Sequence, residues 1–229
     1  MKKLFLLWLV IPMIPIFAYS QSSGKAEKTN RFGIGVGYSF NNLFGDSIHP
    51  VELTFKYKIN EKHAVYLNVP FRLSKKSSNF NYSLSSSEGN MNARNNLYGI
   101  GGGYDYNVPV CTHLEGFVGI GFEYLHLDIL TKNNLLTKNE KNEVIHNSHY
   151  KYSNNRKAYS LLPQMGLRYT IGHFETEVRY KLYMAKIRDT MDEYEIFEVP
   201  VVGESRTYRA PINETKLQGA LSFNISYFF

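Results

Sequence analysis

A histidine and two carboxylates lie close together in the sequence, as acid–base chemistry would require. His126 stands three residues after Glu123 and two before Asp128. A hydrolase needs such a base within hydrogen-bond reach of a nucleophile. No local serine, histidine and acid motif accompanies these residues, and the other histidines fall in polar segments or near predicted strand ends. We therefore expect no enzyme activity and no catalytic residue.

Six carboxylates gather between residues 184 and 213, and carboxylate oxygens are the ligands that Ca²⁺ prefers. They are Asp189, Asp192, Glu193, Glu195, Glu198 and Glu204. Their spacing follows no fixed ligand pattern, which favours a solvated acidic loop. The single cysteine, Cys111, can form neither an intramolecular disulfide nor a Cys-rich metal site. We expect no metal site and no cofactor.

Basic residues are frequent between residues 131 and 157. They are Lys132, Lys138, Lys141, Lys151, Arg156 and Lys157. They could meet the phosphate groups of a lipid surface or simply keep the segment soluble. The formal net charge of +6 is modest and no nucleic-acid module is present, so we expect no nucleic-acid partner. The glycine-rich stretch 99–103 lacks the Lys-Ser/Thr context of a phosphate-binding loop.

The first twenty residues have the pattern of a secretory signal peptide. Lys2 and Lys3 precede an apolar run over 4–17, and Ala18 and Ser20 provide the small residues of a cleavage site. The run is short for a transmembrane helix, which needs about 20 apolar residues. Residues 21–30 form a polar lead-in without apolar periodicity.

The rest of the chain alternates apolar and polar residues, which is typical of strands with two different faces. The pattern predicts eight strands, at 31–40, 51–59, about 63–73, 96–107, 113–130, 161–171, 174–183 and 217–229. In the fifth strand the apolar phase shifts at Leu125, which predicts a β-bulge. Pro163 makes the sixth strand the least regular, because proline cannot donate to a strand ladder.

The connections between these strands alternate in length. Tight turns are predicted at 60–62, 108–112 and 172–173, and long polar loops at 41–50, 74–95, 131–157 and 184–213. Part of the last loop, 194–202, alternates weakly and could extend strands. In an antiparallel meander, the four long loops would therefore lie at one end and the three turns at the other.

The last strand carries a more specific signal. Apolar residues stand at alternate positions up to a final aromatic residue: Leu221, Phe223, Ile225, Tyr227 and Phe229. This pattern resembles the terminal strand of bacterial outer-membrane β-barrel proteins, in which it acts as an assembly signal. The pattern over residues 31–229 is similar to the small OmpA/OmpX-like class. The resemblance implies an all-β, closed, antiparallel, eight-stranded transmembrane barrel with up-and-down topology.

Nine charged residues share the polar faces of the predicted strands. They are Glu52, Lys56, Lys58, Arg72, Arg168, Glu175, Glu177, Arg179 and Lys181. In an outer-membrane barrel they would form a charge network inside the lumen, which eight strands leave only wide enough for side chains. With the faces reversed, the chain would be a soluble, lipocalin-like barrel with an apolar cavity.

The resemblance also implies a location and partners. We expect a monomer in the cell outer membrane, in contact with its lipid and lipopolysaccharide, and with the barrel assembly machinery during biogenesis. The expected role is non-enzymatic: four long extracellular loops for surface interaction, adhesion or envelope integrity. A narrow channel or solute-uptake barrel, a lipid A-modifying enzyme and the soluble ligand-binding barrel are the alternatives.

Overall fold

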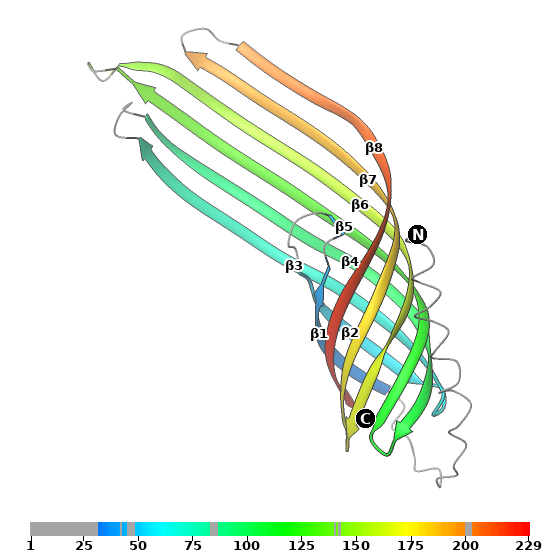
Figure 1. Ribbon diagram of the computed structural model, residues 1–229. Helices are drawn as coiled ribbons and strands as arrows, with labels where there is room; N and C mark the ends of the chain where they lie inside the picture. Colours follow the sequence, from blue (N-terminus) through cyan, green and yellow to red (C-terminus); the bar gives the residue numbers. More distant parts are fainter. Residues whose placement is uncertain are drawn as a thin grey trace, which may run out of the picture.

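Eight antiparallel strands form a closed ring in which each strand is bonded to its neighbours in the sequence and β1 is bonded to β8 (Figure 1). The computed structural model describes residues 32–41, 43–44, 49–82, 87–139, 141, 143–199 and 203–229. The strands are β1 Phe32–Phe40, β2 Val51–Lys58, β3 His63–Tyr82, β4 Ser87–Cys111, β5 Leu114–Lys138, β6 Val144–Ile171, β7 Phe174–Val199 and β8 Gly203–Phe228. The predicted all-β, eight-stranded, closed meander is confirmed.

The ring is closed by the first strand. Val36 of β1 lies opposite Leu53 of β2 on one side and opposite Ile225 of β8 on the other. Because closure pairs both edges of the sheet, the ring exposes no unpaired strand edge. This is the condition that a β-structure must satisfy inside a lipid bilayer, where water cannot bond free backbone groups.

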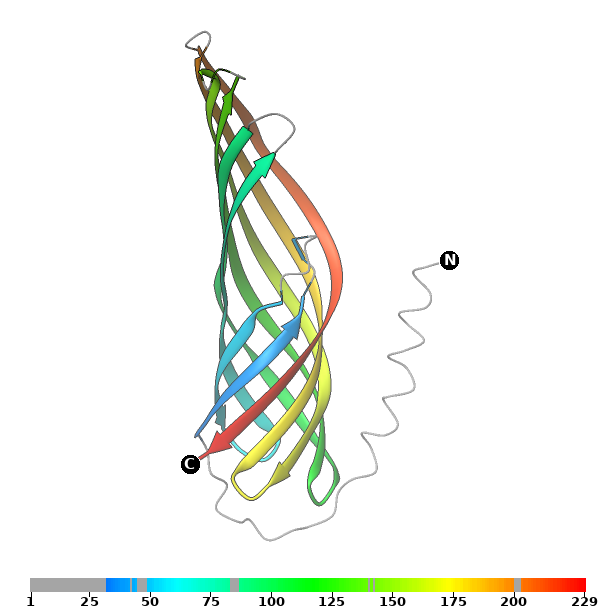
Figure 2. The same cartoon turned by 90° about the vertical axis from the view of Figure 1, so that its left-hand side faces the viewer.

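The strands differ greatly in length, and this divides the molecule into two parts. β1 and β2 have 9 and 8 residues, whereas the other strands have 20 to 28. Beyond Phe71, β3 is paired only with β4, and before Leu221, β8 is paired only with β7. The six strands β3–β8 therefore continue past the ring as an open sheet, here called the extension (Figures 1 and 2).

The extension corrects the prediction of long loops. Most of 74–95, 131–157 and 184–213 lies in paired strands, since β3 continues to Tyr82, β4 begins at Ser87, β5 continues to Lys138 and β6 begins at Val144. The alternation with an apolar outer face is lost there because most side chains on both faces are polar, although the backbone ladder continues. The weakly alternating segment 194–202 was predicted to extend strands, and as far as Val199 it is part of β7. Only the connection between β1 and β2 is a long loop as predicted, of which the structure describes residues 41, 43–44 and 49–50.

The turns at the other end of the ring are short. Those at 60–62 and 172–173 lie as predicted, and Gly172 has a φ of +56°, which glycine adopts without steric cost. The turn predicted at 108–112 is shorter, since β4 continues to Cys111 and only Thr112 and His113 form the turn. The predicted signal peptide and polar lead-in lie outside the described residues. Within the described part of the chain, no helix is long and apolar enough to cross a membrane.

Candidate functional site: the barrel lumen and the extension

The outer wall of the ring is apolar. Side chains with more than a third of their surface exposed include Ile34, Val36, Leu67, Phe71, Ile100, Phe122, Leu161, Leu167, Val178, Phe223 and Ile225. Alternation directs every second side chain of a strand to this wall and the others to the lumen. The residues between them face the lumen, and they include glycines, some apolar side chains and the buried charged residues. The faces therefore have the orientation expected for an outer-membrane barrel. A soluble barrel with an apolar cavity would have the opposite arrangement.

Within the ring, ion pairs fill the half of the lumen near the tight turns. Five cations take part: Lys56, Lys58, Arg168, Arg179 and Lys181. Five carboxylates balance them: Glu52, Asp105, Glu123, Glu175 and Glu177. Removing buried charges from water is costly unless partners and hydrogen bonds compensate each of them. The equal numbers and close contacts meet most of this requirement, although Arg179 Nη1 and Glu123 Oε2 have no hydrogen-bond partner among the described residues. We call these ten residues the lumen network.

Arg168 lies at the centre of the network. Its side chain is 1% exposed; Nε donates to Glu177 at 2.6 Å, Nη1 to Asn107 and Nη2 to Asp105. Asp105 also accepts from Arg179 Nη2 at 2.8 Å. The guanidinium carbon of Arg168 lies 3.9 Å from the ring centroid of Phe117, a cation–π contact. Three strands, β4, β6 and β7, are thus joined through one side chain.

Lysines join β2 to this centre and extend the network toward the extension. Lys56 Nζ donates to Glu175 at 2.7 Å and to Glu177 at 2.6 Å. Lys181 Nζ donates to both carboxylate oxygens of Glu52, at 2.7 and 2.9 Å. These contacts connect β2 with β7, which are not neighbours in the sheet. The lumen is therefore crossed by ion pairs and filled, as the narrow diameter of eight strands suggests.

The structure places eight of the nine charges expected in the lumen within these ion pairs. Arg72 is the exception: it lies on the inner side of β3 beyond the ring, where it is half-buried and has other contacts. Two carboxylates were missed, Asp105 and Glu123. Asp105 lies between the outward-facing Tyr104 and Tyr106, so strand alternation alone would have placed it inside.

Above the charges, the lumen becomes apolar. A buried cluster consists of Leu43, Phe44, Leu97, Leu125, Leu127, Ala158, Leu162, Tyr183, Ala185, Ile187 and Ala220. The β5–β6 register is unbroken across Leu125, so the β-bulge predicted there is wrong. The apolar phase shifts because the inner face becomes apolar, while the strand continues regularly.

Two residues of the cluster come from the loop between β1 and β2. Leu43 and Phe44 fold into the open end of the ring, and their backbone carbonyls accept hydrogen bonds from Lys216 at 2.7 Å and Arg156 at 2.6 Å. Arg156 also donates to Asp189 at 2.8 Å. We call Leu43 and Phe44 the plug. Sequence reasoning missed the plug, although two adjacent large apolar residues in a polar loop were a signal.

Glycines make room for side chains in the narrow lumen. Tyr66 crosses from β3, and its hydroxyl donates to Gln164 at 2.9 Å. A Cβ atom at Gly103 or Gly121 would overlap this hydroxyl. The glycine-rich segment of β4 therefore serves packing inside the barrel, which agrees with the absence of a phosphate-loop context.

The candidate catalytic and calcium-binding groups are divided between the two faces of the sheet. Glu123 faces the lumen and accepts a hydrogen bond from Tyr183 at 2.8 Å, whereas His126 and Asp128 lie on the outer face. His126 stacks on Tyr98 with ring centroids 4.7 Å apart. These three residues therefore do not meet.

The acidic residues of β7 and β8 also do not converge. Asp189 is on the inner face with Arg156, and Asp192 is on the outer face with Arg206. Glu193 and Glu195 lie on the inner face and Glu204 on the outer one, while the side chain of Glu198 is outside the described residues. Among the described side chains, no group of three or more His, Cys, Asp and Glu could hold a metal ion.

The basic residues of 131–157 are likewise separated. Lys132, Lys151 and Lys157 are on the outer face of the extension, and Arg156 is on the inner face. Lys138 pairs with Glu88 at 3.0 Å near the tip, where Lys141 is exposed. The terminal-strand residues Leu221, Phe223, Ile225, Tyr227 and Phe229 are exposed on the apolar wall.

A closed eight-stranded meander with an apolar wall and a charged, filled lumen is the architecture of small outer-membrane β-barrels. The sequence matches no protein-family model and has no significant match among curated proteins. Solved structures with a similar fold include a major outer membrane protein of Thermus thermophilus. It is 12% identical with a TM-score of 0.40, over 87% of this chain and 98% of that one.

Two further structures resemble the chain over 87% of its length. The attachment invasion locus protein Ail of Yersinia pestis is 13% identical, with 97% of its chain covered and a TM-score of 0.38. The outer membrane protease OmpT of Escherichia coli is 8% identical, with 94% covered and a TM-score of 0.45. Similarity of this degree concerns the arrangement of the strands and carries no information on activity.

Proposed function

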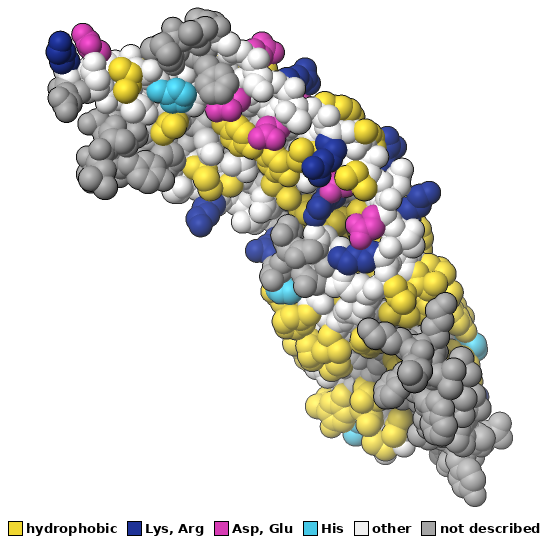
Figure 3. All heavy atoms as spheres, turned by 45° about the horizontal axis from the view of Figure 1, so that its top comes forward, with side chains coloured by type: hydrophobic (Ala, Val, Ile, Leu, Met, Phe, Trp, Pro, Cys, Tyr) yellow, Lys and Arg dark blue, Asp and Glu magenta, His cyan; other side chains and the backbone are white. Residues whose placement is uncertain are grey.

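We propose that this chain is a non-enzymatic, monomeric protein of the bacterial outer membrane that displays a six-stranded extension at the cell surface. The orientation of the two faces of the ring carries the proposal. Exposing this apolar wall to water while burying ten charges would be unfavourable, whereas in a bilayer both faces are satisfied. Figure 3 shows apolar side chains gathered over the ring and charged ones over the extension.

The height of the apolar wall fits a membrane. On β6, outward-facing side chains from Tyr159 to Ile171 include Leu161 and Leu167, with Tyr169 near the lower end. These residues cover about 40 Å along the strand, or about 28 Å of height at a tilt of about 45°. The apolar band of outer-membrane barrels is about 25 Å high, with aromatic residues at both borders.

The filled lumen supports a structural or interaction role over transport. Ion pairs occupy the half near the tight turns, and the apolar cluster with Leu43 and Phe44 occupies the other half. A solute would have to displace both layers. The extension would then be the functional part, available for surface interaction, adhesion or support of the envelope.

A basic patch just beyond the wall supports contact with lipopolysaccharide. Lys157 and Arg188 lie directly opposite each other on the outer face, and Lys186 is on the same face beside Tyr159. Like charges in opposite positions repel, and lipid phosphates at the headgroup level would relieve the repulsion. Among the described residues, none of the three cations has an ion-pair partner in this structure.

The terminal strand supports assembly by the outer-membrane machinery. Its alternating residues from Leu221 to Phe229 lie on the wall, and β8 completes the ring by pairing with β1. Because one chain closes its own ring, the ring needs no second copy to cover an edge, whereas in the extension β3 beyond Phe71 and β8 before Leu221 each have one described strand neighbour.

Membrane fractionation tests this proposal. In cells that express the chain, the protein should remain in the outer-membrane fraction after carbonate extraction. Protease added to intact cells should cleave the extension and leave the ring protected. Recovery of the chain in the soluble periplasm would overturn the proposal, and conductance well above leak in planar bilayers would overturn its closed-barrel part.

A further inference from the structure

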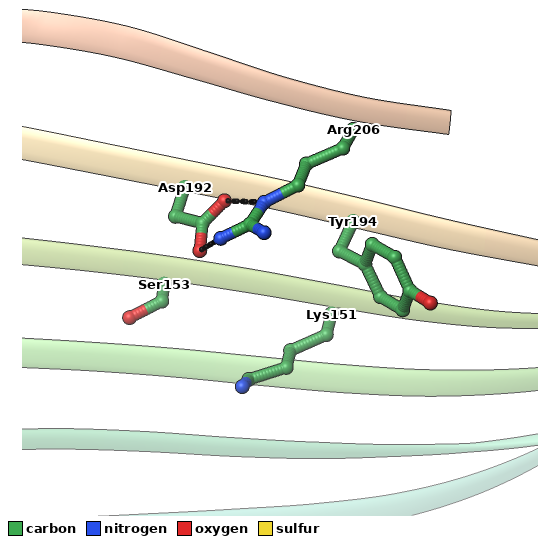
Figure 4. A pocket seen from close by; sticks show the side chains of 5 residues that line it. All are labelled: Lys151, Ser153, Asp192, Tyr194 and Arg206. Carbon is green, nitrogen blue, oxygen red and sulfur yellow. Dashed lines mark hydrogen bonds and ion pairs between the residues drawn. The ribbon is translucent and has the colours of Figure 1, made fainter. Parts of the chain in front are cut away.

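A polar pocket lies on the outer face of the extension, across β6, β7 and β8 (Figure 4). Its lining consists of Lys151, Ser153, Asp192, Tyr194 and Arg206, and its volume is about 210 Å³. Ligand pockets for larger molecules have about 300–1,000 Å³. This pocket therefore suits a single small polar unit.

The lining groups leave one cation available. Arg206 donates to Asp192 through Nε at 3.3 Å and Nη2 at 3.2 Å, so these two side chains are paired with each other. Lys151 lies opposite Tyr194 in the register and forms no ion pair with any described residue. Figure 4 shows its side chain beside Ser153 and the tyrosine ring.

A second lysine adds to the positive charge. Lys132 of β5 is directly opposite Lys151 on the same face, a repulsive cross-strand pair. The carboxylate in the lining is already engaged, because Asp192 pairs with Arg206. An anionic group placed between the two lysines would neutralise a repulsion that the chain itself does not relieve.

The remaining groups are suited to hydroxyls and to the face of a sugar ring. Asp192 and Ser153 offer oxygen acceptors, Arg206 offers donors, and Tyr194 provides an aromatic surface. Tyr208, 64% exposed, lies beside Asp192 in the register and adds a second aromatic surface. One anionic group next to several hydroxyls is the composition of an acidic sugar.

The position of the pocket separates it from the lipid phosphates. Lys151 is eight residues beyond Tyr159 on β6, about 26 Å along the strand from the border of the apolar wall. This distance places the pocket farther from the apolar wall than the basic patch of Lys157 and Arg188. Surface polysaccharide would lie at this distance from the membrane.

We propose that this pocket binds one carboxylated sugar unit of a polysaccharide, with the carboxylate at Lys151 and Lys132, the hydroxyls at Asp192, Arg206 and Ser153, and the ring against Tyr194. The inference rests on the proposed function, because the extension must face the cell exterior to meet such a glycan. The sugar comes either from the cell's own lipopolysaccharide or from a foreign surface, and both present the same chemistry.

Binding to the purified, folded protein in detergent micelles tests the inference without a membrane. An oligogalacturonate serves as the acidic probe and a maltooligosaccharide as the neutral one, with affinity measured by calorimetry. Lys151→Gln should weaken oligogalacturonate binding by about tenfold, as expected for loss of a charge-assisted bond. Tyr194→Leu should weaken it as well. Lys75→Gln, which changes an exposed lysine outside the lining, is the matched control and should bind as the wild type does.

The outcomes are distinct. Absence of oligogalacturonate binding by the folded wild type, equal binding of the neutral probe, or an equal loss in Lys75→Gln would overturn the inference. None of these results bears on membrane insertion, which fractionation tests separately. A parallel titration with the cell's own lipopolysaccharide, deacylated to remove the lipid, identifies the source. Competition with oligogalacturonate indicates a ligand in the same envelope, and its absence indicates a foreign glycan.

Discussion

The ring and the extension are made of the same strands, yet the polarity of their outer faces differs. Within the ring, β6 directs Leu161 and Leu167 outward and Gln164 and Arg168 inward. In the extension, the same strand carries Lys151 outward and Tyr152 inward, and both are in contact with water to some degree. The backbone ladder does not change between the two parts. What changes is the environment, and with it the energetic value of each side-chain interaction.

The largest expected difference concerns ion pairs. In the ring, Arg168→Met would leave Asp105 and Glu177 buried with one partner fewer. Breaking a buried pair in this way costs about 3–5 kcal/mol. Arg94 pairs with Asp128 at 2.9 Å in the extension, but its side chain is 50% exposed. Arg94→Met should therefore cost only about 0–1 kcal/mol.

Urea unfolding of the two variants, refolded in the same detergent, measures this difference. Equal losses of stability would mean that the lumen is more hydrated than the structure indicates. A double-mutant cycle with Asp105→Asn isolates the Arg168–Asp105 interaction from the other partners of the arginine.

A smaller difference is expected for leucines of one strand. Leu127 is fully buried in the apolar cluster, and Leu130 is half-buried on the outer face of the extension. Leu127→Ala should cost about 2–5 kcal/mol because a cavity forms among well-packed neighbours. Leu130→Ala should cost less than half as much, as judged by the shift of the urea midpoint. The opposite ranking would place the stable core in the extension.

The same contrast explains what the sequence could predict. The ring has two different faces, so residues such as Val51, Leu53 and Phe55 alternate with Glu52 and Lys56, and eight strands followed from this pattern. The extension is mostly polar on both faces, so its strands have the composition of loops and were predicted as loops. Beyond the ring, the strands are held together by backbone hydrogen bonds. Such bonds leave little trace in the pattern of polar and apolar residues.

The charged residues of the lumen were predicted, whereas the plug was not, and strand alternation again explains the difference. Alternation directs Arg168 and Lys181 inward without any knowledge of their partners. It does not reveal that Leu43 and Phe44 fold into the ring, because their placement depends on Arg156 and Lys216, which are more than a hundred residues away. Long-range contacts of a loop leave no periodic signal in a single sequence.

The smallest effect concerns a tyrosine on the inner face of the extension. Burial, together with the hydrogen bond and negative charge of Glu193, raises the pKa of Tyr150 to about 12. A raised pKa in the folded state adds stability below the ordinary value near 10, and this contribution is lost as the pH rises from about 10 to 12. In an absorbance titration of the folded protein, Tyr150→Phe should lack one ionisation step near pH 12.

Glu193→Gln provides the matching variant, since it removes the negative charge and keeps the size of the side chain. The pKa of Tyr150 should fall toward its ordinary value but remain raised, because burial is the larger cause. An unchanged titration in Glu193→Gln would mean that the two strands are not paired in this register, with Tyr152 opposite Glu193 and Tyr150 beside it. The titration would then contradict the ordered extension while leaving the ring untouched, because the lumen network lies on other segments of the strands.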